Sequence, residues 1–187
     1  MRLLRLALCS TFLLAACGDD PVDYSAPVGI NLKAKSDDTV NGTVADEKGI
    51  TTESGNPYGE FVADATEALG HDPSDITVED VDLFLGANST GVSELAEIFG
   101  GEVEVLFQMN DTDNSFPVAA GSIPDNAGAG PVDLGIDFDS DALGDADYDK
   151  LLGGSFKVII RGPAAAEFVD KGADADLQVT FTFAAFE

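Results

Sequence analysis

The chain of 187 residues has no tryptophan, a single histidine and only two cysteines. These numbers are too small for the His/Cys ligand sets that bind zinc in proteins. The one histidine, His71, stands in a Gly-His-Asp-Pro stretch that is typical of a turn, where a histidine is usually an exposed polar residue. No Gly-x-Ser-x-Gly motif marks a nucleophilic serine either. We therefore expect no catalytic residues and no enzyme activity.

Basic residues are also scarce. Nine Lys and Arg stand against 35 Asp and Glu, a formal net charge of −26. A surface with this charge repels DNA, RNA and anionic lipid headgroups, so nucleic acid is excluded as a partner. Paired carboxylates could serve a glycosidase, but with 35 acidic residues some pairs occur by chance. Only three tyrosines, and no tryptophan, are present to stack on sugars.

Long hydrophobic runs are missing, and the short one that exists lies at the N-terminus. Arg2 and Arg5 precede an apolar stretch of about nine residues, Leu6 to Leu14. A bilayer-spanning helix needs roughly 20 apolar residues, so the stretch is typical of a secretory signal instead. It ends in Leu14-Ala15-Ala16-Cys17, which resembles the lipobox of bacterial lipoproteins.

The resemblance covers residues 1–17 and implies three modifications. Cys17 would receive a diacylglycerol on its sulfur, the chain would be cut before it, and the new amine would be acylated. The mature chain would then hang from the lipid bilayer with a net charge of −28, because the signal removes two arginines and no acid. Cys9 would leave with the signal, so no disulfide could form. The alternative is an ordinary signal peptide cut near Ala16.

Gly18 bears on the destination of such a lipoprotein. In the sorting rule of enterobacterial lipoproteins, an aspartate directly after the cysteine favours retention in the inner membrane. This chain has Gly18 there, with Asp19 one position later. We therefore expect anchoring in the outer membrane of a bacterial cell envelope, on either its periplasmic or its surface face.

Period-two alternation dominates the rest of the chain and predicts strands with one apolar face. The apolar sets are Val28, Ile30, Leu32 and Ala34; Val103, Val105, Phe107 and Met109; Val132, Leu134, Ile136 and Phe138; Phe156, Val158 and Ile160; and Leu177, Val179, Phe181 and Phe183. Polar residues such as Asn31, Lys33 and Gln178 lie on the opposite faces. The alternation changes phase between Val78 and Val81, which predicts a β-bulge near Glu79-Asp80.

Helical signals are few. Asn56-Pro57 is a helix start, and an apolar stripe then runs to Gly70. Shorter helices are expected within 93–99, 148–152 and 164–169. The pattern predicts a mainly β fold: an antiparallel β-sandwich of immunoglobulin-like architecture with one or two short helical inserts. A closed eight-stranded barrel is the alternative. We expect a signal peptide over 1–16, an acylated N-terminus and flexible tether over 17–26, and a single domain over 27–187.

Acidic loops offer a possible metal site. Asp137, Asp139, Asp141 and Asp145 alternate with other residues, and carboxylates on loops are the ligands that Ca²⁺ prefers. The spacing does not fit an EF-hand, because Ala142 and Tyr148 occupy the positions of its Gly and Glu. A second acidic loop spans Asn110 to Asn114. No other cofactor is expected.

Two functions remain open. The first is a cell-envelope interaction or structural module whose partner is an envelope protein or an extracellular ligand. The second is a calcium-binding lipoprotein whose acidic loops support adhesion.

Overall fold

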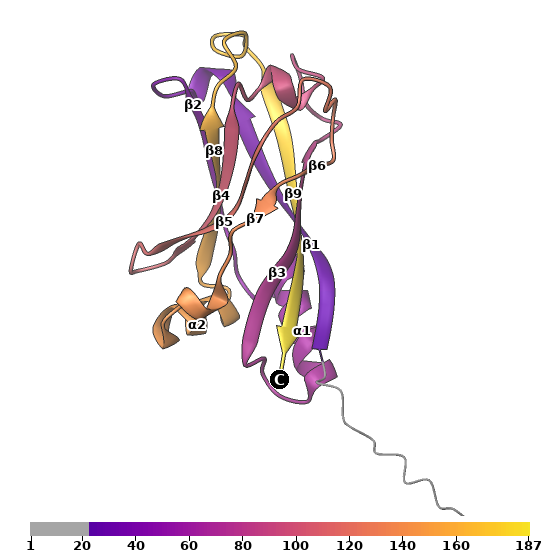
Figure 1. Ribbon diagram of the computed structural model, residues 1–187, viewed down its shortest axis with the longest axis vertical. Helices are drawn as coiled ribbons and strands as arrows, with labels where there is room; N and C mark the ends of the chain where they lie inside the picture. The colour runs from indigo at the N-terminus through magenta and orange to yellow at the C-terminus, as the bar shows by residue number, and fades with distance from the viewer. Residues whose placement is uncertain (1–22) are drawn as a thin grey trace, which may run out of the picture.

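The computed structural model describes residues 23–187, which form two antiparallel sheets packed face to face (Figure 1). The four-stranded sheet has the order β1 (Asp23–Lys35), β9 (Asp174–Phe186), β3 (Asp75–Leu85), β6 (Val132–Asp133). The five-stranded sheet has the order β2 (Thr43–Gly49), β8 (Phe156–Pro163), β4 (Glu102–Met109), β5 (Ser115–Ser122), β7 (Gly135–Ile136). The predicted mainly β sandwich is confirmed.

Two α-helices and three short 3₁₀ helices complete the fold. They are α1 (Pro57–Leu69), α2 (Asp145–Leu152), η1 (Ser36–Asp38), η2 (Leu95–Glu97) and η3 (Ser140–Ala142). Helix α1 begins where the sequence predicts, because the Asn56 side chain accepts a hydrogen bond from the Tyr58 amide. It ends at Gly70, whose φ of 80° favours glycine. The expected helix within 164–169 is absent: Ala164 forms a β-bridge with Phe99, and residues 166–170 form a turn.

The first and last strands of the sandwich are partners. β1 pairs with β9 over all of its 13 residues, from Asp23 opposite Phe186 to Lys35 opposite Asp174. The described chain therefore starts and ends at the same end of the molecule, beside α1 (Figure 1). This order differs from that of immunoglobulin domains, so the likeness is one of architecture. Residues 23–26 belong to β1, and the predicted tether thus overlaps the first strand; residues 17–22 lie outside the described part.

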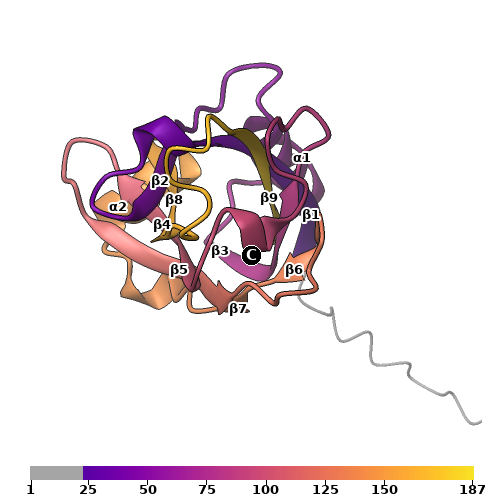
Figure 2. The ribbon, with the colours of Figure 1, turned by 90° about the horizontal axis from the view of Figure 1, so that it is seen from above.

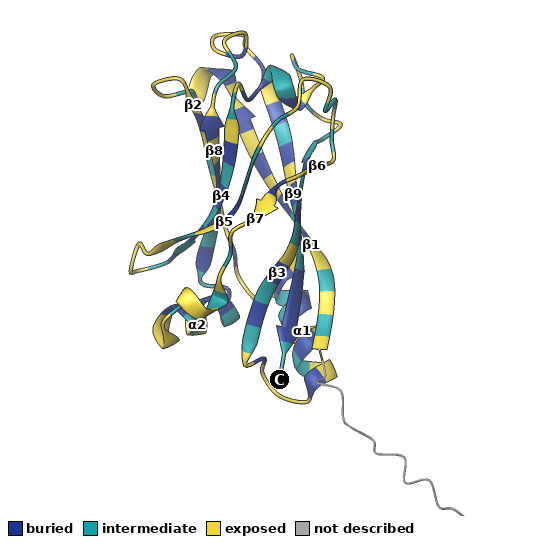
Figure 3. Cartoon of the chain, in the orientation of Figure 1, coloured by how far each residue is buried: buried dark blue, intermediate teal, exposed yellow. Residues whose placement is uncertain are grey.

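The core lies between the two sheets, and burial alternates along the long strands (Figure 3). The four apolar residues predicted to face inward from β9 are 0–1% exposed: Leu177, Val179, Phe181 and Phe183. Phe107 of β4 packs against them, with its ring centroid 5.6 Å from that of Phe181. The register of β3 against β9 shifts between Val78 and Asp80, which confirms the predicted bulge.

The segment predicted as one strand from Val132 to Phe138 is instead shared between the sheets. β6 pairs with β3, and β7 pairs with β5 (Figure 2). Leu134, between the two short strands, is fully buried, whereas Ile136 is 44% exposed and does not face the core as predicted. The reason is that the chain crosses from one sheet to the other after Leu134. The residues before and after this crossing therefore do not share one inward face.

Helix α1 closes the end of the sandwich at which the described chain begins. The Tyr58 ring lies 5.2 Å from both Phe183 of β9 and Phe156 of β8, which belong to different sheets. The Tyr58 hydroxyl donates a hydrogen bond to the Leu151 carbonyl of α2 at 2.9 Å. Burial raises the pKa of this hydroxyl well above its usual range, so it remains a donor.

Candidate functional site

The predicted lipid-bearing residue, Cys17, lies outside the described residues. The predicted metal ligands lie between β7 and α2, where the structure gives several of them local roles. The Asp139 carboxylate accepts a hydrogen bond from the Asp141 amide at 3.1 Å and caps η3. Asp145 is the first residue of α2, and the Asp137 amide donates to the Val118 carbonyl. Within residues 23–187, no group of three or more His, Cys, Asp or Glu side chains converges as a metal site.

The second acidic loop, between β4 and β5, is held by α2. Asp147 is 8% exposed, and its carboxylate accepts hydrogen bonds from the Asn114 amide at 2.8 Å and the Thr112 hydroxyl at 3.3 Å. The Lys150 ammonium donates to the Asn110 carbonyl from the next turn of the helix. This buried carboxylate therefore fixes the hairpin to the helix.

A different set of polar residues meets on the outer face of the four-stranded sheet, where β1 and β9 approach the loop after β3. Together they form a cleft of about 410 Å³, which we call the polar cleft. Its lining residues are Asn31, Leu32, Lys33, Gly86, Ala87, Asn88, Asp176, Leu177 and Gln178. Leu32 and Leu177 point their side chains into the core, so the exposed side chains of the cleft are almost all polar.

Strand register places these residues in two adjacent rows. Asn31 of β1 lies opposite Gln178 of β9, which in turn lies opposite Phe84 of β3. In the next row, Lys33 lies opposite Asp176. Alternate residues of a strand share a face, so both rows point to the same side of the sheet. The half-buried ring of Phe84 therefore borders the amide row of the cleft.

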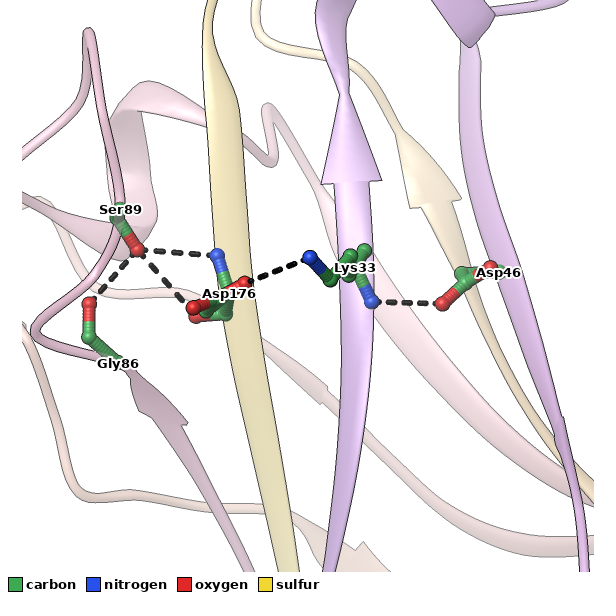
Figure 4. A network of polar contacts seen from close by, with 5 residues as sticks. All are labelled: Lys33, Asp46, Gly86, Ser89 and Asp176. Carbon is green, nitrogen blue, oxygen red and sulfur yellow. Dashed lines mark hydrogen bonds and ion pairs between the residues drawn. The ribbon is translucent and has the colours of Figure 1, made fainter.

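The loop that forms one wall of the cleft is pinned to β9 (Figure 4). The Gly86 amide donates to the Asp176 carbonyl at 2.7 Å. The Ser89 hydroxyl donates to the Gly86 carbonyl at 2.7 Å and accepts from the Asp176 amide at 3.0 Å. A Cβ at Gly86 would lie 3.0 Å from the Asp176 Cβ, so a larger residue there would push the loop and β9 slightly apart. The wall is thus fixed by one backbone hydrogen bond, from Gly86 to Asp176, and by the hydroxyl of Ser89.

Lys33 connects the cleft to the other sheet. Its ammonium lies 3.6 Å from the Asp176 carboxylate, and its backbone amide donates to the Asp46 carboxylate of β2 at 2.6 Å (Figure 4). The second contact bridges the edges of the two sheets and satisfies an amide that β9 does not reach. The Lys33 side chain is 69% exposed, so its ion pair adds little stability and leaves donors free for other contacts.

The electrostatic surroundings of the polar cleft are acidic. Asp82 of β3 lies two residues before Phe84, in the row of the sheet next to that of Asn31 and Gln178. Burial, followed by the negative charges of Asp80 and Asp133, raises the pKa of the Asp82 carboxyl. Lys33 is the positive charge of the cleft, and Asp176 offsets it. The cleft therefore has donors and acceptors without a net positive charge.

Sequence reasoning did not identify this site. The sequence pattern places Asn31, Lys33 and Gln178 on the polar faces of their strands and assigns no role to Asp176 or to the loop after β3. The one detectable signal is an Asn and a Gln among the outward positions of β1 and β9.

None of the helices within residues 23–187 is long and apolar enough to cross a bilayer. No model of a known protein family matches the chain, and no curated protein matches it either. The fold and site thus define an antiparallel β-sandwich with a polar cleft on its outer face.

Proposed function

We propose that this protein is a lipoprotein of the bacterial cell envelope. It is anchored in the outer membrane through acylated Cys17 and acts as an interaction module without enzyme activity. Its partner is an envelope protein or an extracellular ligand. The proposal rests on the lipobox resemblance of residues 14–17 and on the position of the first strand.

The observation that carries the proposal is the distance along β1 between its first residue and the polar cleft. β1 begins at Asp23, six residues after Cys17, at the end of the sandwich closed by α1. Lys33 lies ten residues further along the same strand, about 33 Å away at the rise of an extended strand. A chain anchored at Cys17 would therefore hold the polar cleft away from the bilayer, where a partner can reach it.

The anchor is tested by mass spectrometry of the N-terminal peptide from membrane fractions. We expect a peptide that begins at acylated Cys17, and co-sedimentation of the protein with outer membranes in a density gradient. Cys17→Ser should remove the lipid and release the chain from the membrane fraction. Cys9→Ser is the matched control, because Cys9 lies in the signal and should have no effect. An unmodified N-terminus at Cys17 or Gly18 would refute the anchor.

A further inference from the structure

We propose that the polar cleft binds a neutral saccharide, with the amides of Asn31, Asn88 and Gln178 and the Lys33–Asp176 pair as the groups that contact its hydroxyls. This inference deepens the proposed function by naming a class of ligand for the interaction module. The ligand is then a glycan rather than a protein surface.

The chemistry of the side chains favours hydroxyl groups. A carboxamide carries a donor and an acceptor side by side, and a sugar hydroxyl is itself both donor and acceptor. Asn31 and Gln178 are exposed and lie opposite each other on adjacent strands, while Asn88 comes from the pinned loop. Lys33 supplies further donors and Asp176 further acceptors. A ring with neighbouring hydroxyls can satisfy such a mixed set, whereas a purely anionic or cationic group cannot.

The cleft is organised before any ligand arrives. Its floor is paired backbone of β1 and β9, and its wall is held by Gly86 and Ser89. A Cβ at Gly29 would lie 2.9 Å from Gln178 Nε2, so the Gln178 amide would have to move if residue 29 carried a side chain. Because this backbone is already fixed, only the exposed side chains lose conformational entropy on binding, and this matters for ligands that bind through a few hydrogen bonds.

Charge selects a neutral saccharide over an acidic one. Asp80, Asp82 and Asp133 lie on the same face of the sheet, and the whole chain carries a net charge of −26. A carboxylate-bearing sugar would be repelled by this surface. Phe84 lies opposite Gln178 in the sheet, beside the residues that line the cleft, and its partly exposed side chain is the apolar group that would contact the C–H face of a sugar ring.

The test uses the full chain in a detergent without a sugar headgroup. The probes are cellotetraose, maltotetraose and tetra-N-acetylchitotetraose, with tetragalacturonate as the acidic probe. Binding is followed by NMR signals of the side-chain amides. We expect saturable shifts of the Asn31 and Gln178 signals with at least one neutral probe, at a Kd of about 1 mM or tighter. Tetragalacturonate should cause none.

Variants locate the site. Gln178→Ala and Asn31→Ala should each weaken binding about tenfold, the effect of losing one or two hydrogen bonds. Gly29→Ala, which displaces the Gln178 amide, should weaken it as well. Gln108→Ala is the matched control, because Gln108 lies on β4 in the other sheet and should leave binding unchanged. Urea denaturation verifies that each variant is folded.

Three outcomes would overturn the inference: no binding of any neutral probe, binding of tetragalacturonate alone, or binding that persists in Gln178→Ala and Asn31→Ala. The assay does not depend on Cys17, so the two proposals fail separately. If a lipidated chain binds no neutral probe, only the saccharide site is refuted. If the chain binds a neutral probe but its N-terminal peptide from membrane fractions is unmodified, only the anchor is refuted.

Discussion

Phe181 and Thr180 are neighbours in β9 whose side chains point to opposite faces of the four-stranded sheet. Phe181 is fully buried, with its ring 5.5 Å from that of Phe183, whereas Thr180 is half-buried on the outer face. We expect Phe181→Ala to reduce the free energy of unfolding by about 3–5 kcal/mol, because it leaves a cavity in a packed core. Thr180→Ala should cost much less. Urea denaturation measures both, and equal losses would contradict the packing described here.

The pKa of the Glu97 carboxyl depends on contacts that form only in the folded chain. Its carboxylate accepts hydrogen bonds from the Ser93 amide at 2.6 Å and the Glu94 amide at 3.2 Å, and it lies 2.9 Å from the Lys171 ammonium. The Ser93 amide first, and then Lys171, lower the pKa of Glu97 to about 2. Carbon-detected NMR titration should therefore show a midpoint far below the ordinary value of about 4.3.

This lowered pKa has a consequence for stability. A carboxyl whose pKa is lower in the folded state stabilises the fold above its unfolded pKa, and that contribution is lost as pH falls toward about 2. Glu97→Gln should therefore lose less stability than the native chain between pH 6 and about 2.5. If the native carboxyl titrates near 4, or if the variant shows the same acid sensitivity, the hydrogen bonds to Glu97 do not persist in solution.

Among the elements, the β4–β5 hairpin and α2 are joined by the buried carboxylate of Asp147 and by the Lys150 ammonium. Asp147→Ala would remove hydrogen bonds to Thr112 and Asn114 and should destabilise the chain by about 1–3 kcal/mol. Amides of the hairpin loop should then exchange with solvent faster. Asp145→Ala, in the same helical turn but exposed, is the matched control and should change little. If amide exchange is unchanged in Asp147→Ala, the hairpin loop is ordered without its contacts to Asp147.

Sequence patterns predicted the elements that bury one complete face. β9 alternates without interruption, and α1 carries both a cap and a terminal glycine, so local signals and packing agree. β2 and β5 were not predicted. β2 is an edge strand in which Val44 alone is buried, and β5 contains Pro117 and small residues, so neither shows the apolar alternation of a core strand.

The polar cleft could not be predicted because it depends on strand order. Asn31 and Gln178 are far apart in the sequence, and they become neighbours only through the pairing of the first strand with the last. The Gly86–Ser89 loop reaches them only because β3 lies on the other side of β9. Alternation gives the face of each residue, but it does not give the partner of each strand. The acidic loops, by contrast, are conspicuous in the sequence. In the structure, Asp139 caps η3, and Asp147 of α2 accepts a hydrogen bond from Asn114 of the second loop.

Viewed as a whole, the molecule combines a continuous core with a strongly acidic exterior. The net charge of −26 creates self-repulsion that opposes the compact state, and salt weakens it by screening. We expect the melting temperature to rise with NaCl up to about 0.5 M, where the screening length is about 4 Å. A melting temperature that is independent of NaCl would mean that the acidic groups are too well separated to matter.

Divalent ions distinguish this general effect from a specific site. A calcium site would stabilise the chain by mass action at concentrations too low to screen, by about 2.7 kcal/mol at a hundred times the Kd. Because the Asp139 carboxylate caps η3 and Asp145 begins α2, we expect about 1 mM Ca²⁺ in 0.5 M NaCl to act no differently from Mg²⁺. Calorimetric melting curves provide the measurement. A rise specific to Ca²⁺, abolished by Asp139→Asn and Asp141→Asn, would contradict this expectation and favour the adhesion module that binds metal through its acidic loops.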